Sequence, residues 1–261
     1  MKLTKIAPRL DTIPAEFHSL LLNGQVFDSS CSKDAKVLFI DKDDGYFLKK
    51  APKGSLHEEC IMTRYFHSKK LAAEVIAYAS YEQDWLLTGR LSGEDCIAQK
   101  YLDDPIRLCD TLAELLRRLH DESHDGCPVQ DLTAQRLNMA EENYRTGWYD
   151  KSMFPDNWGF STPEEAWSQI EKNGKFLKND TLIHGDYCLP NVLLDNWKFS
   201  GFIDLGGAGI GDRHFDLFWG IWSLYFNLKT NDHCDRFIDA YGTDRIDKET
   251  LRTIAAIEVF S

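Results

Sequence analysis

The chain has 261 residues, of which 43% are hydrophobic and 12% aromatic, so it can bury a substantial core as one large domain or two lobes and is not disordered. Its formal net charge of −12 disfavours binding to nucleic acid or anionic membranes and suits a cationic ligand. No apolar run reaches the roughly 18 residues of a membrane span, and the first ten residues lack a secretory apolar core, so we expect a cytoplasmic protein. Seven scattered cysteines without a Cys-x-x-Cys pair predict neither a disulfide framework nor a zinc site.

The first third of the chain favours β-structure. A short leading helix is expected within residues 1–24, where Gly24 ends it. Strands are expected over residues 36–40 and 46–50, with Gly45 in the turn between them, and again over 74–79 and 84–88. Alternation along residues 46–50 places Phe47 and Lys49 on the covered face and Leu48 outward. Residues 57–70 predict a helix with the apolar positions Ile61, Met62, Tyr65 and Phe66.

The segment after residue 104 predicts mainly helices. In the first of them, Asp104 is the expected cap and Pro105 lies in the first turn. Its apolar stripe comprises Ile106, Cys109, Leu112, Leu116 and Leu119. His120 follows the stripe and is expected to cap the helix end or lie at the surface.

Further helices are expected after Thr162, over residues 212–228 and over residues 247–261. The second is interpreted as buried through Phe215, Phe218, Ile221, Trp222 and Tyr225. Residues 121–161 are polar and irregular, and their acids alternate with aromatic residues. This pattern suits a polyamine sugar, and the alternative is an ordinary helix–turn insertion.

The most informative stretch is Thr181–Gly207, which carries six polar or glycine residues on short predicted strands joined by a turn. They are His184, Gly185, Asp186, Asn191, Asp204 and Gly206. Transfer of a γ-phosphoryl group from ATP to a hydroxyl needs one carboxylate to orient the hydroxyl and accept its proton, and oxygen ligands for Mg²⁺. Asp186 can serve as the carboxylate, and Asn191 and Asp204 as the ligands. A single acid beside a turn is usually only solvated, but the joint spacing favours phosphoryl transfer.

This stretch resembles the catalytic and metal loops of the aminoglycoside phosphotransferases, which relate to protein kinases through a His-x-Asp-xxxx-Asn loop and an Asp-x-Gly loop. Gly185 stands where protein kinases carry Arg, and Leu205 where they carry Phe. The resemblance runs from about residue 30 to the C-terminus, with specific motifs only from 181 to 216. It implies an α+β, protein-kinase-like, two-lobed fold. A β-rich nucleotide-binding lobe would span residues 1–90, a mainly helical catalytic and substrate-binding lobe residues 91–261, and ATP would lie between them.

The resemblance also implies the nucleotide contacts. Lys49 matches the phosphate-binding lysine and Glu59 the glutamate that positions it, although Lys50 and Glu58 are adjacent competitors. The loop before residue 36 has no Gly-x-Gly-x-x-Gly; Ser30 or Ser32 could donate to a phosphate, and a polar turn is the equal alternative. The backbone from Gly89 to Leu91 would hold adenine.

For the substrate, the resemblance implies contacts at two places in the second lobe: a loop just before the helix expected after Thr162, and the last residues of the sequence. Asp156 and Asn157 match a substrate-binding acidic loop, and the ending Glu258, Phe260 and Ser261 matches one where a glutamate and the terminal carboxylate bind amines. Asp216 would brace the catalytic loop together with His184. The expected protein is a monomer or homodimer that uses ATP, with GTP as the alternative donor, and Mg²⁺ to phosphorylate the 3'-hydroxyl of a cationic aminoglycoside.

Two other functions stay open. A kinase of the same fold could act on another small alcohol, such as choline, homoserine or a macrolide. A pseudokinase that binds nucleotide without turnover would be expected to lack a catalytic or metal residue, and the sequence retains all of them.

Overall fold

The computed structural model describes residues 3–31, 35–153 and 158–261. The chain forms two compact units, which are described separately: Met1–Ala98 together with Asn191–Gly206, and Gln99–Pro190 together with Gly207–Ser261. The segment with the predicted metal ligands therefore packs with the first unit. Over the described ranges, none of the helices combines the length and apolar character needed to span a bilayer.

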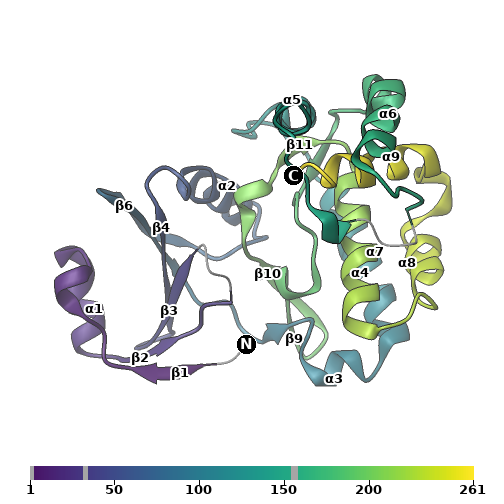
Figure 1. Ribbon diagram of the computed structural model, residues 1–261. Coiled ribbons are helices and arrows are strands. Elements are labelled where there is room, and N and C mark those ends of the chain that lie inside the picture. Colours follow the sequence, from purple (N-terminus) through teal and green to yellow (C-terminus); the bar gives the residue numbers. More distant parts are fainter. Residues whose placement is uncertain (1–2, 32–34, 154–157) are drawn as a thin grey trace. The chain divides into compact units, whose positions relative to one another are not determined.

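The first unit is built on a six-stranded antiparallel sheet with the strand order β1-β2-β3-β4-β6-β5 (Figure 1). The strands are β1 (Thr4–Ile6), β2 (Gln25–Asp28), β3 (Lys36–Asp41), β4 (Tyr46–Pro52), β5 (Val75–Ser80) and β6 (Gln83–Gly89). The strands expected from the alternating pattern are confirmed to within a few residues at their ends. Gly45 has a φ of 91° in the β3–β4 turn, which explains the glycine at that position.

The leading segment forms two 3₁₀ turns, η1 (Leu10–Thr12) and η2 (Ala15–Phe17), followed by the short helix α1 (His18–Leu22). It buries Phe17 and Leu21 in the same apolar cluster as Leu48 of β4. Leu48 is fully buried, so the expectation that it points outward was wrong. Both faces of β4 are covered, and the leading segment packs on the face opposite to Lys49.

The other face of β4 meets α2 (His57–Ser68) through Lys49 and Glu59. Met62 and Phe66 of this helix are buried as predicted, whereas Ile61 and Tyr65 are only half-buried. A smaller sheet in the same unit has the order β10-β9-β7 and contains β7 (Glu94–Asp95), β9 (Val192–Asp195) and β10 (Lys198–Phe202). Its hairpin is attached to the segment that follows α2, because the Phe202 amide donates to the Leu71 carbonyl.

The second unit is mainly helical (Figure 1). Its α-helices are α3 (Gln99–Leu102), α4 (Pro105–His120), α5 (Leu132–Thr146), α6 (Pro163–Asn173), α7 (His214–Leu228), α8 (Cys234–Tyr241) and α9 (Lys248–Glu258), and its two-stranded sheet pairs β8 (Thr181–Ile183) with β11 (Gly209–Gly211). The 3₁₀ turns of the rest of the chain are η3 (Lys151–Met153), η4 (Gly174–Phe176), η5 (Leu189–Asn191), η6 (Leu205–Gly207) and η7 (Thr243–Arg245).

Side-chain caps explain where several of these helices begin. The side chains of Asp104, Thr162 and Asp247 accept hydrogen bonds from first-turn amides of α4, α6 and α9, as these residue types do at helix N-termini. The helix starts expected from Asp104, Thr162 and Asp247 are therefore confirmed.

Two details of the predicted apolar faces were wrong. Leu112 and Leu116 of α4 are buried, but Ile106 is 52% exposed. In α7, Phe215, Phe218 and Ile221 are buried and Tyr225 is 39% exposed. Ile106 lies in the first turn of α4 and Tyr225 in the last turn of α7, so the error in each helix lies near one end.

Candidate active site

Lys49 lies at the centre of a charged cluster in the first unit. Its Nζ is 2.8 and 3.0 Å from the two carboxylate oxygens of Glu59 and 2.6 Å from Oδ1 of Asp204. The competitors are placed elsewhere: Nζ of Lys50 lies 5.1 Å from the ring centre of Trp85, and Glu58 is exposed. The pairing of Lys49 with Glu59 is therefore the one that the fold forms.

The charges in this cluster stabilise a cation at Lys49. Burial alone would lower the pKa of Lys49, but the charges of Asp204 and Glu59 outweigh it and raise the pKa above 10.5. Burial and the nearby Asp204 raise the pKa of Glu59, and the charge of Lys49 opposes them. One ammonium faces two carboxyl groups, which is an arrangement able to bind phosphate oxygens at Lys49 and a metal cation at Asp204.

The two predicted metal ligands are tied together through the backbone. Asn191 ends η5 and is buried, and its carbonyl accepts a hydrogen bond from the amide of Ile203. Asp204 follows with a φ of 57° and a side chain that is 50% exposed. Carboxylate and amide oxygens are the donors that Mg²⁺ prefers.

Among the residues that the structure describes, no three His, Cys, Asp or Glu side chains converge as a metal cage. Mg²⁺ is usually held by one or two protein oxygens together with water and substrate phosphates. The donors present at Asn191 and Asp204 therefore fit Mg²⁺ on a nucleotide.

The other groups predicted to contact the nucleotide, at Ser30 and from Gly89 to Leu91, already have partners within the protein. Oγ of Ser30 accepts a hydrogen bond from the Val37 amide, which favours the polar-turn alternative, and Ser32 lies outside the described residues. The Gly89 amide donates to the Glu74 carbonyl, and the Leu91 side chain lies against Gly201. Adenine contacts in this stretch would thus come from Leu91 or from carbonyl groups.

In the second unit, the loop after β8 carries Asp186 and is held by buried Asp216. The carboxylate of Asp216 accepts hydrogen bonds from the amides of His184 (2.8 Å) and Gly185 (2.7 Å). Nδ1 of the buried His184 ring accepts from the Asp186 amide at 3.3 Å. Asp186 itself is half-buried. The hydrogen bond to its amide fixes its backbone, and its carboxylate stays accessible.

Gly185 is required by this loop. Its φ is 81°, and a Cβ at this position would collide with the Gly207 carbonyl. By contrast, a Cβ at Gly206 would make only an ordinary 3.6 Å contact with Glu59. The structure therefore demands a glycine at position 185 but not at position 206.

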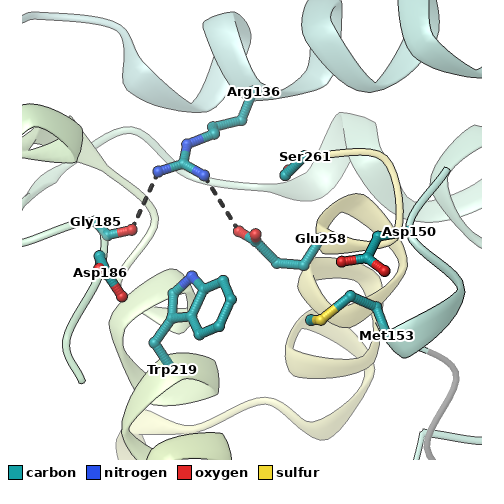
Figure 2. Close-up of a pocket in the computed structure, with 8 residues that line it drawn as sticks. All are labelled: Arg136, Asp150, Met153, Gly185, Asp186, Trp219, Glu258 and Ser261. Atoms are coloured by element: carbon teal, nitrogen blue, oxygen red, sulfur yellow. Dashed lines mark hydrogen bonds and ion pairs between the residues drawn. The ribbon is translucent and has the colours of Figure 1, made fainter. Parts of the chain in front are cut away.

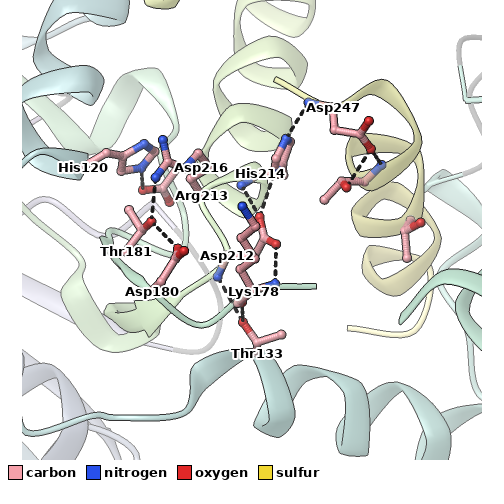
Figure 3. A network of polar contacts seen from close by, with 12 residues as sticks. His120, Thr133, Lys178, Asp180, Thr181, Asp212, Arg213, His214, Asp216 and Asp247 are labelled. Carbon is pink, nitrogen blue, oxygen red and sulfur yellow. Dashed lines mark hydrogen bonds and ion pairs between the residues drawn. The ribbon is translucent and has the colours of Figure 1, made fainter. Parts of the chain in front are cut away.

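His120 supports Asp216 from α4 (Figure 3). Nε2 of His120 lies 3.0 Å from Oδ2 of Asp216, and Nδ1 lies 2.8 Å from the hydroxyl of Tyr241. Burial lowers the pKa of His120 below 6.5, so the neutral ring donates to Asp216 and accepts from Tyr241. The expectation that His120 lies at the surface or caps the helix was wrong, because its partners come from remote segments.

A second buried carboxylate connects the start of α7 with its neighbours (Figure 3). Asp212 accepts hydrogen bonds from Nδ1 of His214 (2.6 Å) and from the Lys178 amide (2.7 Å). Burial opposes ionisation, but these hydrogen bonds hold the pKa of Asp212 below its usual value. Nε2 of His214 accepts from the Asp247 amide at 3.0 Å, so the beginning of α9 is fixed to the beginning of α7.

A pocket of about 270 Å³ opens beside Asp186 (Figure 2). It is lined by Arg136, Asp150, Met153, Gly185, Asp186, Trp219, Glu258 and Ser261. Burial raises the pKa of Glu258, the charge of Arg136 opposes this, and Asp186 adds to it. With three acidic side chains facing one arginine, the pocket suits a cationic ligand that carries a hydroxyl to Asp186.

Four of the eight lining residues, Gly185, Asp186, Glu258 and Ser261, were named from the sequence, and the other four were not singled out as site residues. Asp150 lies in the stretch of alternating acids and aromatic residues that was interpreted as suiting a polyamine sugar, so the sequence did contain a signal for it. Trp219 belongs to a helix that was interpreted as buried through other residues. Arg136 and Met153 lie in segments that show no local pattern pointing to a site.

Phe260 is placed differently from the other C-terminal residues. Its side chain is fully buried, with edge-to-face ring contacts to Tyr144 and Trp167, and it does not line the pocket. We therefore assign Phe260 to anchoring the chain end. Asp156 and Asn157 lie outside the described residues.

Comparison with known proteins agrees with this geometry. The family model described as the phosphotransferase enzyme family matches residues 25–254. A probable aminoglycoside 3'-phosphotransferase of Lactococcus lactis subsp. lactis (strain IL1403) is 48% identical over 259 residues, which cover 99% of this chain and 98% of the relative. An aminoglycoside 3'-phosphotransferase of Salmonella typhimurium is 30% identical over 67% of this chain and 65% of the relative.

Solved structures share the fold. An aminoglycoside-3'-phosphotransferase of type VIII aligns with a TM-score of 0.73 and 22% identity, over 89% of this chain and 91% of that one. The aminoglycoside phosphotransferase APH(3'')-Id from Streptomyces rimosus, solved with ADP and streptomycin, aligns with a TM-score of 0.70 and 20% identity, over 86% and 90% of the two chains. The chain therefore belongs to the phosphotransferase enzyme family, with the aminoglycoside phosphotransferases as its relatives and a protein-kinase-like fold.

Proposed function

We propose that this protein is a cytoplasmic, ATP-dependent kinase that phosphorylates the 3'-hydroxyl of aminoglycoside antibiotics and so confers resistance. The observation that carries the proposal is the acidic pocket, in which Asp186 shares one cavity with Asp150 and Glu258. A substrate with several ammonium groups would be held there by carboxylates, with a hydroxyl directed to Asp186. The 48% identical relative is named for the same regiochemistry.

Each residue has a defined task in this reaction. Asp186 orients the acceptor hydroxyl and takes its proton, while Lys49, positioned by Glu59, binds phosphate oxygens of the nucleotide. Asn191 and Asp204 would hold Mg²⁺, which supplies neutralisation of the phosphate charge when bound. Glu258 binds a substrate amine, and Ser261, Asp156 and Asn157 are retained as predicted substrate contacts.

The test is ADP release by the purified protein with ATP and Mg²⁺. The acceptors are kanamycin, an analogue that lacks the 3'-hydroxyl, and choline. We expect turnover with kanamycin alone. Asp186→Ala should reduce kcat at least about 1,000-fold, since it removes both orientation and proton acceptance. Asp232→Ala is the matched control, because Asp232 is an exposed acid of the same unit.

Other results would change the proposal in defined ways. Equal turnover of the 3'-deoxy analogue would contradict the regiochemistry. Turnover of choline without any aminoglycoside would retain the fold and the catalytic residues but replace the substrate. Nucleotide binding without turnover of any acceptor would indicate a pseudokinase.

A further inference from the structure

Arg136 contacts both the catalytic loop and the acidic wall of the pocket (Figure 2). It projects from α5, and its side chain is 17% exposed. Nη2 donates to the Gly185 carbonyl at 3.1 Å, and Nη1 lies 3.5 Å from Oε1 of Glu258. The guanidinium also lies over the ring of Phe215, 5.6 Å from its centre.

The backbone around the guanidinium leaves room for it. A Cβ at Gly207 would come within 3.1 Å of Nη2 of Arg136, so a larger residue there would displace the guanidinium. The planar fork of arginine can direct separate N–H groups at two acceptors while its face rests on an aromatic ring, which a lysine ammonium cannot do.

Arg136 also completes the fixation of the peptide that precedes Asp186. The amide of Gly185 is held by Asp216, and the carbonyl of the same residue is held by Arg136. Both sides of Gly185 are thus restrained, and the orientation of the following Asp186 is set by these contacts.

Arg136 is a positively charged side chain in a pocket that suits a positively charged ligand, so its presence there needs a physical reason. Its charge repels an ammonium group, so Arg136 weakens direct recognition of the substrate. Its two contacts instead fix the position of Glu258, which would bind an amine, relative to Gly185, the residue that precedes Asp186.

We propose that Arg136 is a positioning residue that couples amine binding at Glu258 to the alignment of the acceptor hydroxyl at Asp186. The inference rests on the proposed function for its substrate. The inference gives α5 a part in the reaction, although this helix lies outside the motifs of residues 181–216.

Arg136→Met should lower kcat/KM for kanamycin about 100-fold, the loss typical of an ångström-scale misplacement of reacting groups, with changes in both kcat and KM for kanamycin and an unchanged KM for ATP. Arg136→Lys, which keeps the charge, should recover part of the loss. Arg145→Met is the matched control, because Arg145 lies on the same helix and pairs only at the surface with Glu141.

Coupling to Glu258 is tested with a double variant. If Arg136 acts through Glu258, the effects of Arg136→Met and Glu258→Gln on the KM for kanamycin should combine to less than their product. Multiplicative effects would contradict the coupling, since a merely structural arginine would act independently of the amine contact.

A readout without turnover separates this inference from the proposed function. Hydrogen exchange of the peptide over residues 182–190 should be faster in Arg136→Met than in Arg145→Met, at matched melting temperature. If the wild type phosphorylates no aminoglycoside but exchange still accelerates, the substrate assignment fails and the positioning stands. If the wild type is active while kinetics and exchange are unchanged in both Arg136 variants, the inference is overturned.

Discussion

Glu258 is a single carboxyl group whose ionisation determines what the pocket can bind. Burial raises its pKa above 4.5, and this is only partly offset by Arg136. As the pH falls through this raised pKa, Glu258 takes up a proton and loses the charge that holds an amine. We expect the KM for kanamycin to rise as the pH is lowered, in steady-state assays at saturating ATP.

Glu258→Gln removes this charge at every pH. Its KM should be about 10-fold to 100-fold higher at neutral pH, which corresponds to one charge-assisted hydrogen bond, and should depend less on pH. Glu171→Gln is the control at an exposed glutamate. An acid limb that persists unchanged in Glu258→Gln would assign the titration to another group. For stability the sign is opposite: a raised carboxyl pKa means that the free energy of unfolding falls as the pH rises from the ordinary to the raised value.

At the level of elements, α4 shows how tertiary packing selects the buried part of an apolar stripe. Leu112 is 1% exposed and Ile106 is 52% exposed, although both fit the same helical spacing. Leu112→Ala should lower the free energy of unfolding by about 2–5 kcal/mol, because it leaves a cavity. Ile106→Ala should change it by less than about 0.5 kcal/mol. Urea denaturation measures both, and equal losses would contradict the packing described for α4.

For the whole molecule, nucleotide binding should appear as thermal stabilisation. A ligand at 100 times its dissociation constant stabilises the folded state by about 2.7 kcal/mol, or roughly 5–10 °C in melting temperature for a chain of this size. We expect this shift with ATP and Mg²⁺, and a smaller one after EDTA treatment, because a metal held at Asp204 would offset the repulsion between that carboxylate and the phosphates. Calorimetry or dye-based melting measures it.

Lys49→Ala should abolish most of the nucleotide-induced shift. Lys50→Ala should retain it, because Lys50 projects to Trp85 on the other face of β4. The two variants remove the same side chain from adjacent positions. Equal loss in both would mean that the cluster around Lys49 does not bind the nucleotide.

The sequence by itself determined the family and the kind of fold. It also singled out Asp186, Asn191 and Asp204 as candidates, because phosphoryl transfer restricts the residue types it can use and these three lie within one short segment. Strand alternation also separated Lys49 from Lys50, since adjacent side chains in a strand point to opposite faces.

Only the tertiary structure decided the surroundings of these residues. His120 is buried because Asp216 and Tyr241, 96 and 121 residues away, close around it. Arg136 reaches Gly185 and Glu258 across 49 and 122 residues. Local patterns record the spacing of side chains along one element, whereas burial, pKa and pairing depend on which remote elements pack together.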